Sequence, residues 1–290
     1  MGYLKVKTVE RPSDGFKFEC LDKASAVACV IFNSDYSKVL LVKQFRAGAN
    51  KDIYELPAGV VDEGEDFKTA MLREVEEETG FRADQLSDIC DLGSFYVSPG
   101  YTSEVMSLWC ARVHSGVVAQ AQKLCGEEQI VLEWMTLHQI KNTVDDMKTQ
   151  LGLSRALERP KKRIGIFGGT FNPTTFLHLS TGERAVEELN LHELVFEPVA
   201  TNYAKKDIIA ARHRISMLRA AVRNNDKFKC GDYEVFRGQS VSLDTLKHYQ
   251  NIYGWADIFF ICGSDVLRDM TNWPKTAQLL EGFDVVCVTT

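Results

Sequence analysis

The chain has 290 residues, of which 45% are apolar, so it is long enough for one large domain or two ordinary ones with real cores. Its net charge of −6 argues against nonspecific attraction to nucleic acid or to an acidic membrane, although divalent metals and local lysines still allow phosphate substrates. No stretch approaches the roughly 20 apolar residues of a membrane span, and none of the eight cysteines forms a CxxC pair, so we expect free thiols in a reducing compartment, the cytoplasm or the nucleus.

The first half of the chain is rich in strand-like segments. The runs "AVACVIF" and "KVLLVKQF" flank the turn signal "NSDYS" and predict a hairpin, and further strands are expected at "SDICDLGSFYV", "EVMSLWCARV" and "QIVLEWMTL". One clear helix is expected from about Asp66 to Thr79, ending at Gly80. This order predicts an α+β domain with a mixed sheet over residues 1–158.

The pattern of expected strands and helices changes near residue 160 and divides the chain there. The string "HQIKNTVDDMKTQLGLSRALER" predicts one polar amphipathic helix, and "RPKKR" at 159–163 predicts a solvated linker. From Ile164 onward, strand-like runs such as "RIGIF", "ELVFEPV", "ADIFFIC" and "FDVVCV" alternate with helix-like ones. Such alternation predicts a parallel sheet built from βαβ units, a Rossmann-like α/β domain over residues 164–290.

Four glutamates crowd the end of the first expected helix, in "LREVEEETGF". On a helix, Glu74 and Glu78 share a face, Glu77 borders it and Glu76 points away to solvent. Arg73 can reach Glu77 or Glu76 and hold one carboxylate in place. Taken alone, the string is more often a solvated acidic face. With Mg²⁺ or Mn²⁺ the same carboxylates form a hard-oxygen site that also binds phosphate oxygens.

The surrounding residues favour the metal site. Gly59, Glu65 and "REVEEETGF" stand at the spacing of the Nudix box, so residues 25–140 resemble a Nudix hydrolase. The resemblance implies hydrolysis of a nucleoside diphosphate linked to another moiety, through attack of metal-activated water on phosphorus. It also implies that Glu77 has a catalytic role. The metal ligands that it implies are Glu74, Glu78 and Glu77.

The segments that flank the Nudix box indicate a narrower class of substrate. "LLVKQFRAG", "ELPAGVVDEGE" and "SPGYTSE" resemble the ADP-ribose and nucleotide-sugar pyrophosphatase branch. The resemblance implies substrate contacts from Arg46 and Gly59, and a catalytic glutamate on a late loop. In "GEEQIVLEW" we prefer Glu128 to Glu127, and Glu104 in "SPGYTSE" is a rival. Relatives of this branch are often dimers, so the resemblance also implies a homodimer.

A second candidate site lies in "IGIFGGTFNPTTFLHL", where a Gly-Gly turn separates an expected strand from a helix. Small residues there let the backbone approach a phosphate, and the helix N-terminus favours its charge. A bare Gly-Gly is common, but the full string resembles the nicotinamide mononucleotide adenylyltransferases. Many relatives carry His-x-Gly-His at this point, whereas eukaryotic members resemble this chain, which has Thr175 and the single His178.

Segments farther along, "EPVATNYAKKDIIAARHR", "ICGSDVL" and "NWPK", resemble the same family. The resemblance implies that a mononucleotide phosphate attacks the α-phosphorus of ATP, with Mg²⁺ helping, while His178 and Lys205 stabilise charge. Trp273 is expected to stack on the pyridine ring, with Tyr233 as a second candidate. Whether the pyridine is nicotinamide or nicotinate stays open. The nucleotide-contacting residues implied are Gly168, Gly169, Thr170, Phe171, Gly263 and Asp265.

One feature of the family is absent from residues 164–290. The late Ser/Thr-rich motif that ends in arginine and grips the ATP phosphates does not occur there, so this domain is expected to be truncated or crippled. We predict a bifunctional enzyme of NAD metabolism whose ligands are ADP-ribose or a nucleotide sugar, ATP and a pyridine mononucleotide. The alternative is an active Nudix pyrophosphatase with a nucleotide-binding regulatory domain. The intact carboxylates disfavour a mere nucleotide sensor.

Overall fold

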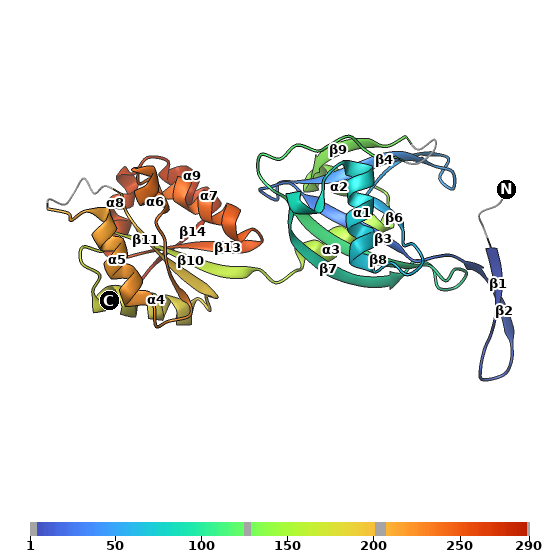
Figure 1. Ribbon diagram of the computed structural model, residues 1–290, viewed down its shortest axis with the longest axis horizontal. Coiled ribbons are helices and arrows are strands. Elements are labelled where there is room, and N and C mark those ends of the chain that lie inside the picture. The colour runs from blue at the N-terminus through green and yellow to red at the C-terminus, as the bar shows by residue number, and fades with distance from the viewer. Residues whose placement is uncertain (1–4, 125–128, 201–206, 289–290) are drawn as a thin grey trace. The chain divides into compact units, whose positions relative to one another are not determined.

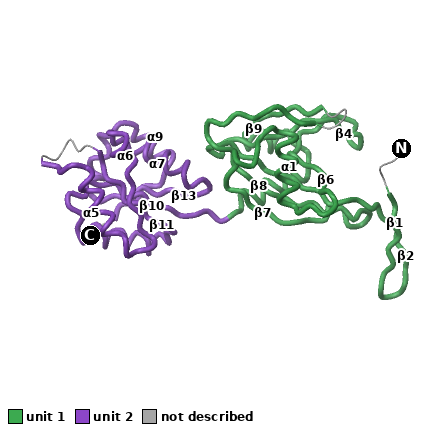
Figure 2. The backbone as a smooth tube through the Cα atoms, viewed as in Figure 1, with its two compact units in different colours: residues 1–159 green, residues 160–290 purple. Residues whose placement is uncertain are grey.

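The computed structural model describes residues 5–124, 129–200 and 207–288. The chain divides into two compact units, Met1–Arg159 and Pro160–Thr290 (Figures 1 and 2). Within the described residues, no helix has the length and apolar character needed to cross a lipid bilayer. Each unit has its own hydrophobic cores, one on each face of its main sheet.

The main sheet of unit 1 is mixed, as predicted, and has seven strands. Its strands are β3 (Ala26–Phe32), β4 (Lys38–Arg46), β5 (Lys51–Glu55), β6 (Ala58–Val60), β7 (Leu86–Tyr96), β8 (Val105–Val113) and β9 (Val131–Thr136). They follow the order β5-β4-β3-β8-β7, with β6 on β3 and β9 on β4. Strands β3 and β8 are parallel, whereas β3 and β4 form the predicted antiparallel hairpin.

Strand β3 is buried along its whole length because helices cover both of its faces. Val27, Cys29 and Ile31 pack in the cluster that contains residues of α1 (Phe67–Thr79). The alternate residues Val30 and Phe32 pack in the cluster that contains residues of α3 (Met147–Leu157). The continuous apolar run "AVACVIF" therefore reflects a central strand between two helical layers.

Helix α1 has the predicted ends. The Asp66 side chain accepts hydrogen bonds from the Lys68 and Thr69 N–H groups, and Gly80 ends the helix in the left-handed region, at φ 74°.

The prediction of a single helix after β9 is wrong. Two helices, α2 (Leu137–Thr143) and α3 (Met147–Leu157), replace it. Asp146 starts α3 because its carboxylate accepts a hydrogen bond from the Thr149 N–H at 3.0 Å, a local bond that favours a new helix start over a continuous one.

An unpredicted hairpin precedes the sheet of unit 1. Strands β1 (Lys5–Glu10) and β2 (Lys17–Asp22) pair with each other as a separate two-stranded sheet, and a single bridge joins Leu21 of β2 to Thr102 (Figure 1). Phe16 and Phe18 are 57% and 46% exposed, with their rings in contact. The Leu21 N–H donates to the Tyr101 carbonyl, which ties the base of the hairpin to the loop before β8. A short 3₁₀ helix, η1 (Ala83–Gln85), precedes β7.

Unit 2 has the predicted parallel sheet. Its strands are β10 (Lys162–Gly169), β11 (Glu193–Pro198), β12 (Phe228–Cys230), β13 (Ala256–Cys262) and β14 (Asp284–Cys287). Their order is β12-β11-β10-β13-β14, and every pair is parallel. The expected linker is shorter than predicted, because Lys162 and Arg163 pair with β13 as the start of β10. The Arg163 guanidinium also donates to the Leu189 carbonyl.

Helices cover both faces of this sheet, as in a Rossmann-like fold. Residues of α4 (Phe176–Glu188) and α5 (Ala211–Val222) pack in the cluster on one face, and residues of α7 (Ser242–Tyr253) and α9 (Thr276–Gly282) in the cluster on the other. The shorter elements are α6 (Tyr233–Arg237), α8 (Ser264–Asp269) and η2 (Met270–Asn272).

A buried carboxyl group lies in the α7 face of unit 2. Glu197 on β11 is fully buried, and it accepts hydrogen bonds from the Tyr249 hydroxyl at 2.5 Å and from the Glu234 N–H at 2.8 Å. Burial raises the pKa of Glu197 to about 7, even though both hydrogen bonds favour the carboxylate. The folded state therefore binds a proton at Glu197 more tightly than the unfolded state does.

Replacing Glu197 with glutamine is expected to make the free energy of unfolding of unit 2 depend less on pH. Since the folded pKa of about 7 exceeds the ordinary 4.5, the stability due to protonated Glu197 is present below pH 4.5 and is lost as pH rises to about 7. The loss approaches roughly 3 kcal/mol, at about 1.4 kcal/mol per pKa unit. Urea unfolding at pH 5 and pH 8 measures it. Equal losses in wild type and Glu197→Gln would contradict the assignment.

Candidate active sites

Two of the predicted metal ligands of unit 1 lie together against the three-residue strand β6. The Glu78 carboxylate is only 7% exposed and accepts a hydrogen bond from the Ala58 N–H at 2.9 Å. The Glu74 carboxyl group lies against Gly59, where a Cβ atom would stand 2.0 Å from its carboxyl carbon. The sequence spacing of four residues on α1 thus brings two carboxylates to adjacent residues of β6.

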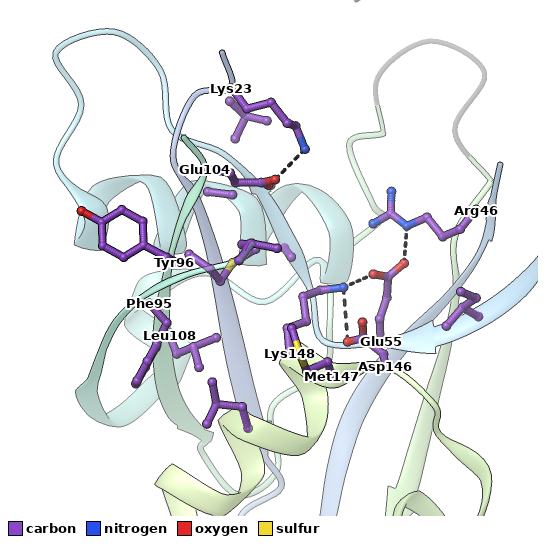
Figure 3. A pocket seen from close by; sticks show the side chains of 18 residues that line it. Lys23, Arg46, Glu55, Phe95, Tyr96, Glu104, Leu108, Asp146, Met147 and Lys148 are labelled. Carbon is purple, nitrogen blue, oxygen red and sulfur yellow. Dashed lines mark hydrogen bonds and ion pairs between the residues drawn. The ribbon is translucent and has the colours of Figure 1, made fainter. Parts of the chain in front are cut away.

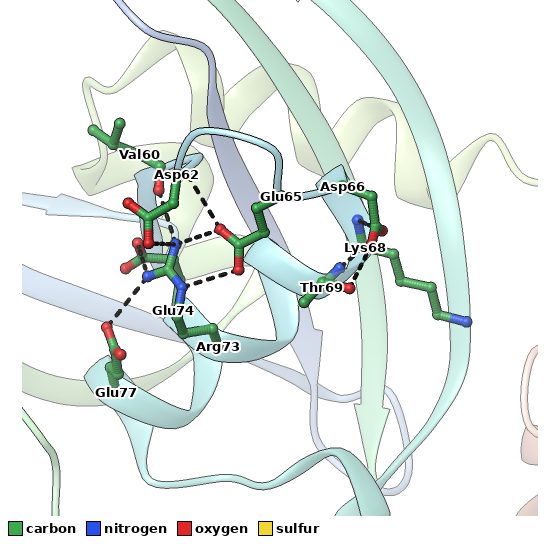
Figure 4. Close-up of polar contacts among 9 residues, drawn as sticks. All are labelled: Val60, Asp62, Glu65, Asp66, Lys68, Thr69, Arg73, Glu74 and Glu77. Atoms are coloured by element: carbon green, nitrogen blue, oxygen red, sulfur yellow. Dashed lines mark hydrogen bonds and ion pairs between the residues drawn. The ribbon is translucent and has the colours of Figure 1, made fainter.

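Arg73 organises the carboxylates around this site (Figure 4). Its Nε and Nη2 atoms donate to both oxygens of Glu65, at 3.1 and 2.9 Å, and Nη2 also donates to the Val60 carbonyl. Its Nη1 atom lies 2.7 Å from Glu74 Oε1 and 3.4 Å from Glu77 Oε2. These contacts join the loop before α1 to the helix, a bidentate arrangement for which arginine is suited.

Glu76 has a different role from the one predicted. Its carboxylate pairs with the Lys123 ammonium at 2.6 Å near the surface, and among the described residues it forms no ion pair with Arg73. Its partner lies on the loop after β8, so the fourth glutamate of the cluster holds that loop.

The donors around Glu78 suit a hard divalent cation. Burial, and next to it the neighbouring Glu74 charge, raise the pKa of Glu78 to about 8, although the Ala58 N–H favours the carboxylate. A cation between the two carboxylates would offset that repulsion. Among the described residues, no group of three or more acidic, histidine or cysteine side chains is already arranged as a metal cage. Residues Glu74 and Glu78 would therefore hold a cation with help from water or substrate oxygens.

Replacing Gly59 with alanine is expected to weaken metal-dependent hydrolysis at least tenfold while the fold persists. The added Cβ would meet the far end of the flexible Glu74 side chain, which can swing away at little cost in stability but then leaves Glu78. A Mg²⁺ titration of the hydrolysis rate, with calorimetric melting in parallel, measures both effects. Gly48→Ala is the matched control, since nothing lies within 4 Å of its Cβ. Equal Mg²⁺ dependence in the two variants would contradict the role of Gly59.

A pocket of about 480 Å³ opens beside Gly59 in unit 1 (Figure 3). Its floor carries Glu55, which is 2% exposed and pairs with Arg46 Nε at 2.5 Å and with the Lys148 ammonium. At the rim, Glu104 pairs with Lys23 at 2.7 Å. Apolar walls face these charges, formed by residues that include Phe95, Met106, Leu108 and Leu151. A cavity with an apolar wall and a few convergent charges is typical of a small-ligand site.

The pocket contains residues that sequence reasoning missed. Arg46 and Gly59, for which the sequence predicts substrate contacts, both line it. Glu55 and Lys148 also line it, and they come from β5 and α3, nearly a hundred positions apart. No local pattern signals that pairing, although a charged residue in the run before "LPAG" was a usable hint.

The late loop is tied to the carboxyl end of α1. The Gln120 N–H donates to the Gly80 carbonyl at 2.9 Å, the Gln122 side chain to the Glu78 carbonyl, and the Lys123 N–H to the Glu77 carbonyl. These bonds satisfy carbonyls that a helix end leaves without partners. The predicted Glu128 and its neighbour Glu127 lie outside the described residues.

In unit 2 the glycine turn stands at the point where the strand order reverses. Strand β10 ends at Gly169, and the chain proceeds to β11 on one side while β13 pairs on the other. Ligands of open α/β sheets bind at such a switch point, outside the carboxyl ends of the strands. Phe171 follows the turn at φ 47°, a left-handed conformation that is unusual for a bulky residue, and is 1% exposed.

His178 is held by the start of α4. Its Nδ1 atom accepts a hydrogen bond from the Thr175 N–H at 3.0 Å and lies 2.8 Å from the Thr175 hydroxyl. The ring also packs edge-on against Phe171 at 5.1 Å. Because Nδ1 is an acceptor, a neutral His178 carries its proton on Nε2 and can donate it. Thr175 therefore orients the one histidine of the motif.

Gly263 and Asp265 directly follow β13, and Trp273 contacts that strand through Phe260. A Cβ at Gly168 would lie 3.4 Å from Phe260, whose ring contacts Trp273 edge-on at 6.1 Å. Trp273 also donates to Asp269. Gly263 precedes α8 as its N-cap, with exposed Asp265 in the first turn. Lys205 lies outside the described residues.

Tyr233, the second stacking candidate, is engaged elsewhere. Its ring stacks on His248 with 3.7 Å between centroids and 8° between planes. The pair lines a separate surface pocket of about 400 Å³ beside β12. Tyr233 thus lies apart from the glycine turn, whose residues do not line that pocket.

The chain matches two protein-family descriptions. Residues 22–153 match the "NUDIX domain", and residues 166–290 match "Cytidylyltransferase-like". Each matched segment lies within one of the two units, and their folds agree with the mixed and the parallel sheet.

Curated relatives carry the name "Probable nicotinate-nucleotide adenylyltransferase". The chain is 37% identical over 122 residues to the protein of Clostridium acetobutylicum and 34% identical over 127 residues to that of Desulfitobacterium hafniense, covering 41% and 43% of this chain and 61% of each relative. It is 32% identical over 124 residues to that of Lactococcus lactis, covering 42% of this chain and 64% of the relative. The chain thus spans less than two thirds of these relatives.

Proposed function

In a chain that joins a Nudix domain to a cytidylyltransferase-like domain, we propose a bifunctional enzyme of NAD metabolism that hydrolyses a nucleoside diphosphate sugar and synthesises a pyridine dinucleotide. Unit 1 would hydrolyse ADP-ribose, or a related nucleotide sugar, to a nucleoside monophosphate and a sugar phosphate. The observation that carries this is the pair Glu74 and Glu78, set against β6 beside a pocket that Arg46 lines.

The residues of unit 1 would divide the work of hydrolysis. Glu74 and Glu78, with Glu77 nearby, would hold Mg²⁺ or Mn²⁺, which supplies charge neutralisation and an activated water when bound. Arg46, fixed by Glu55, would bind the diphosphate or ribose part of the substrate. Glu128 would accept the proton of the attacking water. Apolar pocket walls would hold the base or sugar and limit bulk water.

Unit 2 would transfer the adenylyl group of ATP to nicotinate mononucleotide. The names of the curated relatives favour nicotinate over nicotinamide. The phosphate of the mononucleotide would attack the α-phosphorus, and pyrophosphate would leave. His178, donating from Nε2, and Lys205 would stabilise the developing charge, and the turn from Gly168 to Phe171 would lie along the phosphates. The nucleotide and the pyridine ring would lie near Gly263, Asp265 and Trp273.

We also propose that the chain forms a homodimer through its β1–β2 hairpin. Two strands are marginally stable in water unless something covers them, and this hairpin exposes Phe16 and Phe18. A solution mass of one chain, 32.7 kDa, at micromolar concentration would refute the dimer.

All cysteines of the described residues are free, which agrees with a reducing compartment such as the cytoplasm or nucleus.

Two assays on the 290-residue chain test the proposed activities. The first measures AMP formation from ADP-ribose with Mg²⁺, and the second measures nicotinate adenine dinucleotide and pyrophosphate from ATP and nicotinate mononucleotide. Both products are expected. No hydrolysis of any nucleoside diphosphate sugar would refute the first activity. Tight ATP binding without transfer would refute the second and indicate a regulatory module instead.

A further inference from the structure

A fully buried arginine lies beneath the glycine turn of unit 2. Arg214 on α5 is 1% exposed and is the largest of the fully buried side chains. Burial lowers its pKa, yet a guanidinium stays charged at neutral pH. Within the described residues no carboxylate pairs with it, so its charge is balanced only by dipoles. A buried charge of this kind is costly unless hydrogen bonds or an opposite charge compensate for it.

Within the described residues, the three hydrogen bonds of Arg214 all go to backbone carbonyls. Its Nη1 atom donates to the Thr170 carbonyl at 2.7 Å, and Nη2 to the Val199 carbonyl at 2.8 Å. Its Nε atom donates to the Ile209 carbonyl at 3.3 Å. Arg214 therefore joins the segments that follow β10 and β11. The Val199 N–H closes the same link by donating to the Gly169 carbonyl at 2.9 Å.

The bond to Thr170 determines how the turn presents its N–H groups. The carbonyl and the N–H of one peptide group point in opposite directions. Because the Thr170 carbonyl faces Arg214, the N–H of Phe171 faces away from it, and it donates to no group in the described part of the chain. The left-handed φ of Phe171 is the strained conformation that accompanies this arrangement. Successive N–H groups at such a bend form a concavity that attracts anions.

We infer that Arg214 is a positioning residue for a phosphate group at the glycine turn, which it orients through the Thr170 carbonyl and favours through its buried charge. This inference rests on the proposed nucleotide site of unit 2. A bound phosphate would supply the opposite charge that Arg214 does not meet among the residues the structure describes. Removing the guanidinium should therefore weaken the binding of ligands that carry phosphate and leave the binding of a nucleoside unchanged.

The test compares three ligands on the full chain with Arg214→Gln, Arg214→Lys and the matched control Arg219→Gln. Arg219 is on the same helix but exposed, and it pairs with exposed Asp232. Calorimetry measures the Kd of ATP and of pyrophosphate, and ligand-observed NMR measures adenosine. In Arg214→Gln, we expect the Kd of ATP and of pyrophosphate to rise about tenfold or more, with adenosine unchanged. Arg214→Lys should recover part of the loss through its charge, and Arg219→Gln should match wild type.

The outcomes separate the inference from the proposed function. If wild type binds neither ATP nor pyrophosphate, both fail. If wild type binds them and a folded Arg214→Gln binds them within twofold, only the inference fails. An equal loss for adenosine would also overturn it, because it would show a general collapse of the site. Should Arg214→Gln not fold, Arg214→Lys decides: unchanged ATP binding overturns the inference, and weaker binding of phosphate ligands alone supports it.

Discussion

Glu78→Gln is expected to abolish metal-dependent hydrolysis by unit 1 without unfolding it. Loss of a residue that only supports a metal ligand costs about 10- to 100-fold, so loss of a ligand should exceed about 100-fold. The amide is nearly isosteric, and its oxygen can still accept the Ala58 N–H. Since burial raises the pKa of Glu78 to about 8, a neutral amide at this position removes a desolvation cost and should not destabilise the metal-free protein.

The measurement is the rate of AMP release at several Mg²⁺ concentrations, with melting temperature in parallel. Glu76→Gln is the matched control on the same helix, because Glu76 forms a surface ion pair with Lys123 and such pairs contribute about 0–1 kcal/mol. The control should keep most of its activity. Adenylyl transfer by unit 2 should be the same in both variants. Full hydrolysis by Glu78→Gln would contradict the metal assignment.

Gly80→Ala is expected to give the largest loss of stability in unit 1. Gly80 has φ 74°, and a Cβ there would stand 2.0 Å from the Gln120 carbonyl oxygen, which is backbone and cannot rotate away. The left-handed conformation alone costs roughly 1–2 kcal/mol for a non-glycine residue. Displacing the late loop adds to this, so we expect about 3 kcal/mol or more, in the upper range for single substitutions.

Gly116→Ala separates the two contributions. Gly116 has φ 78°, but nothing lies within 4 Å of its Cβ, so it carries the conformational cost alone. Calorimetry of the full chain should show a lower transition for unit 1 in Gly80→Ala and an unchanged transition for unit 2. Similar melting of the two variants would show that the contact with Gln120 is unimportant. Hydrolysis should fall with Gly80→Ala, because the loop that it displaces is bonded to the carbonyls of Glu77 and Glu78.

Regular elements were predictable because their signals are local. The run "AVACVIF" and the helix between Asp66 and Gly80 carry their own patterns, and the strand–helix alternation after Ile164 predicts the parallel sheet of unit 2. The β1–β2 hairpin was missed although "FKFEC" alternates apolar and polar residues, a strand signal. Its strands bury almost nothing, so no contact with the main sheet follows from that pattern. The break between α2 and α3 depends on one capping bond at Asp146.

The candidate sites divide in the same way. Spacing along one helix predicts that Glu74 and Glu78 share a face, and in the structure both carboxylates lie against β6. Contacts between distant segments were not predictable, including that of Lys148 with Glu55. Arg214 belongs to the quoted "ARHR" segment, but its function depends on carbonyls that only the folded turn brings within reach.

Arg73 has a consequence for how unit 1 survives changes in its ionic surroundings. The guanidinium already acts as a counterion inside the acidic cluster, with contacts to Glu65, Glu74 and Glu77. A divalent cation would thus join a cluster that is partly neutralised, whereas many structural zinc sites must bind metal before they fold. Removing the cation with a chelator would abolish the activity of such a protein without unfolding it, and adding the cation back would restore the activity.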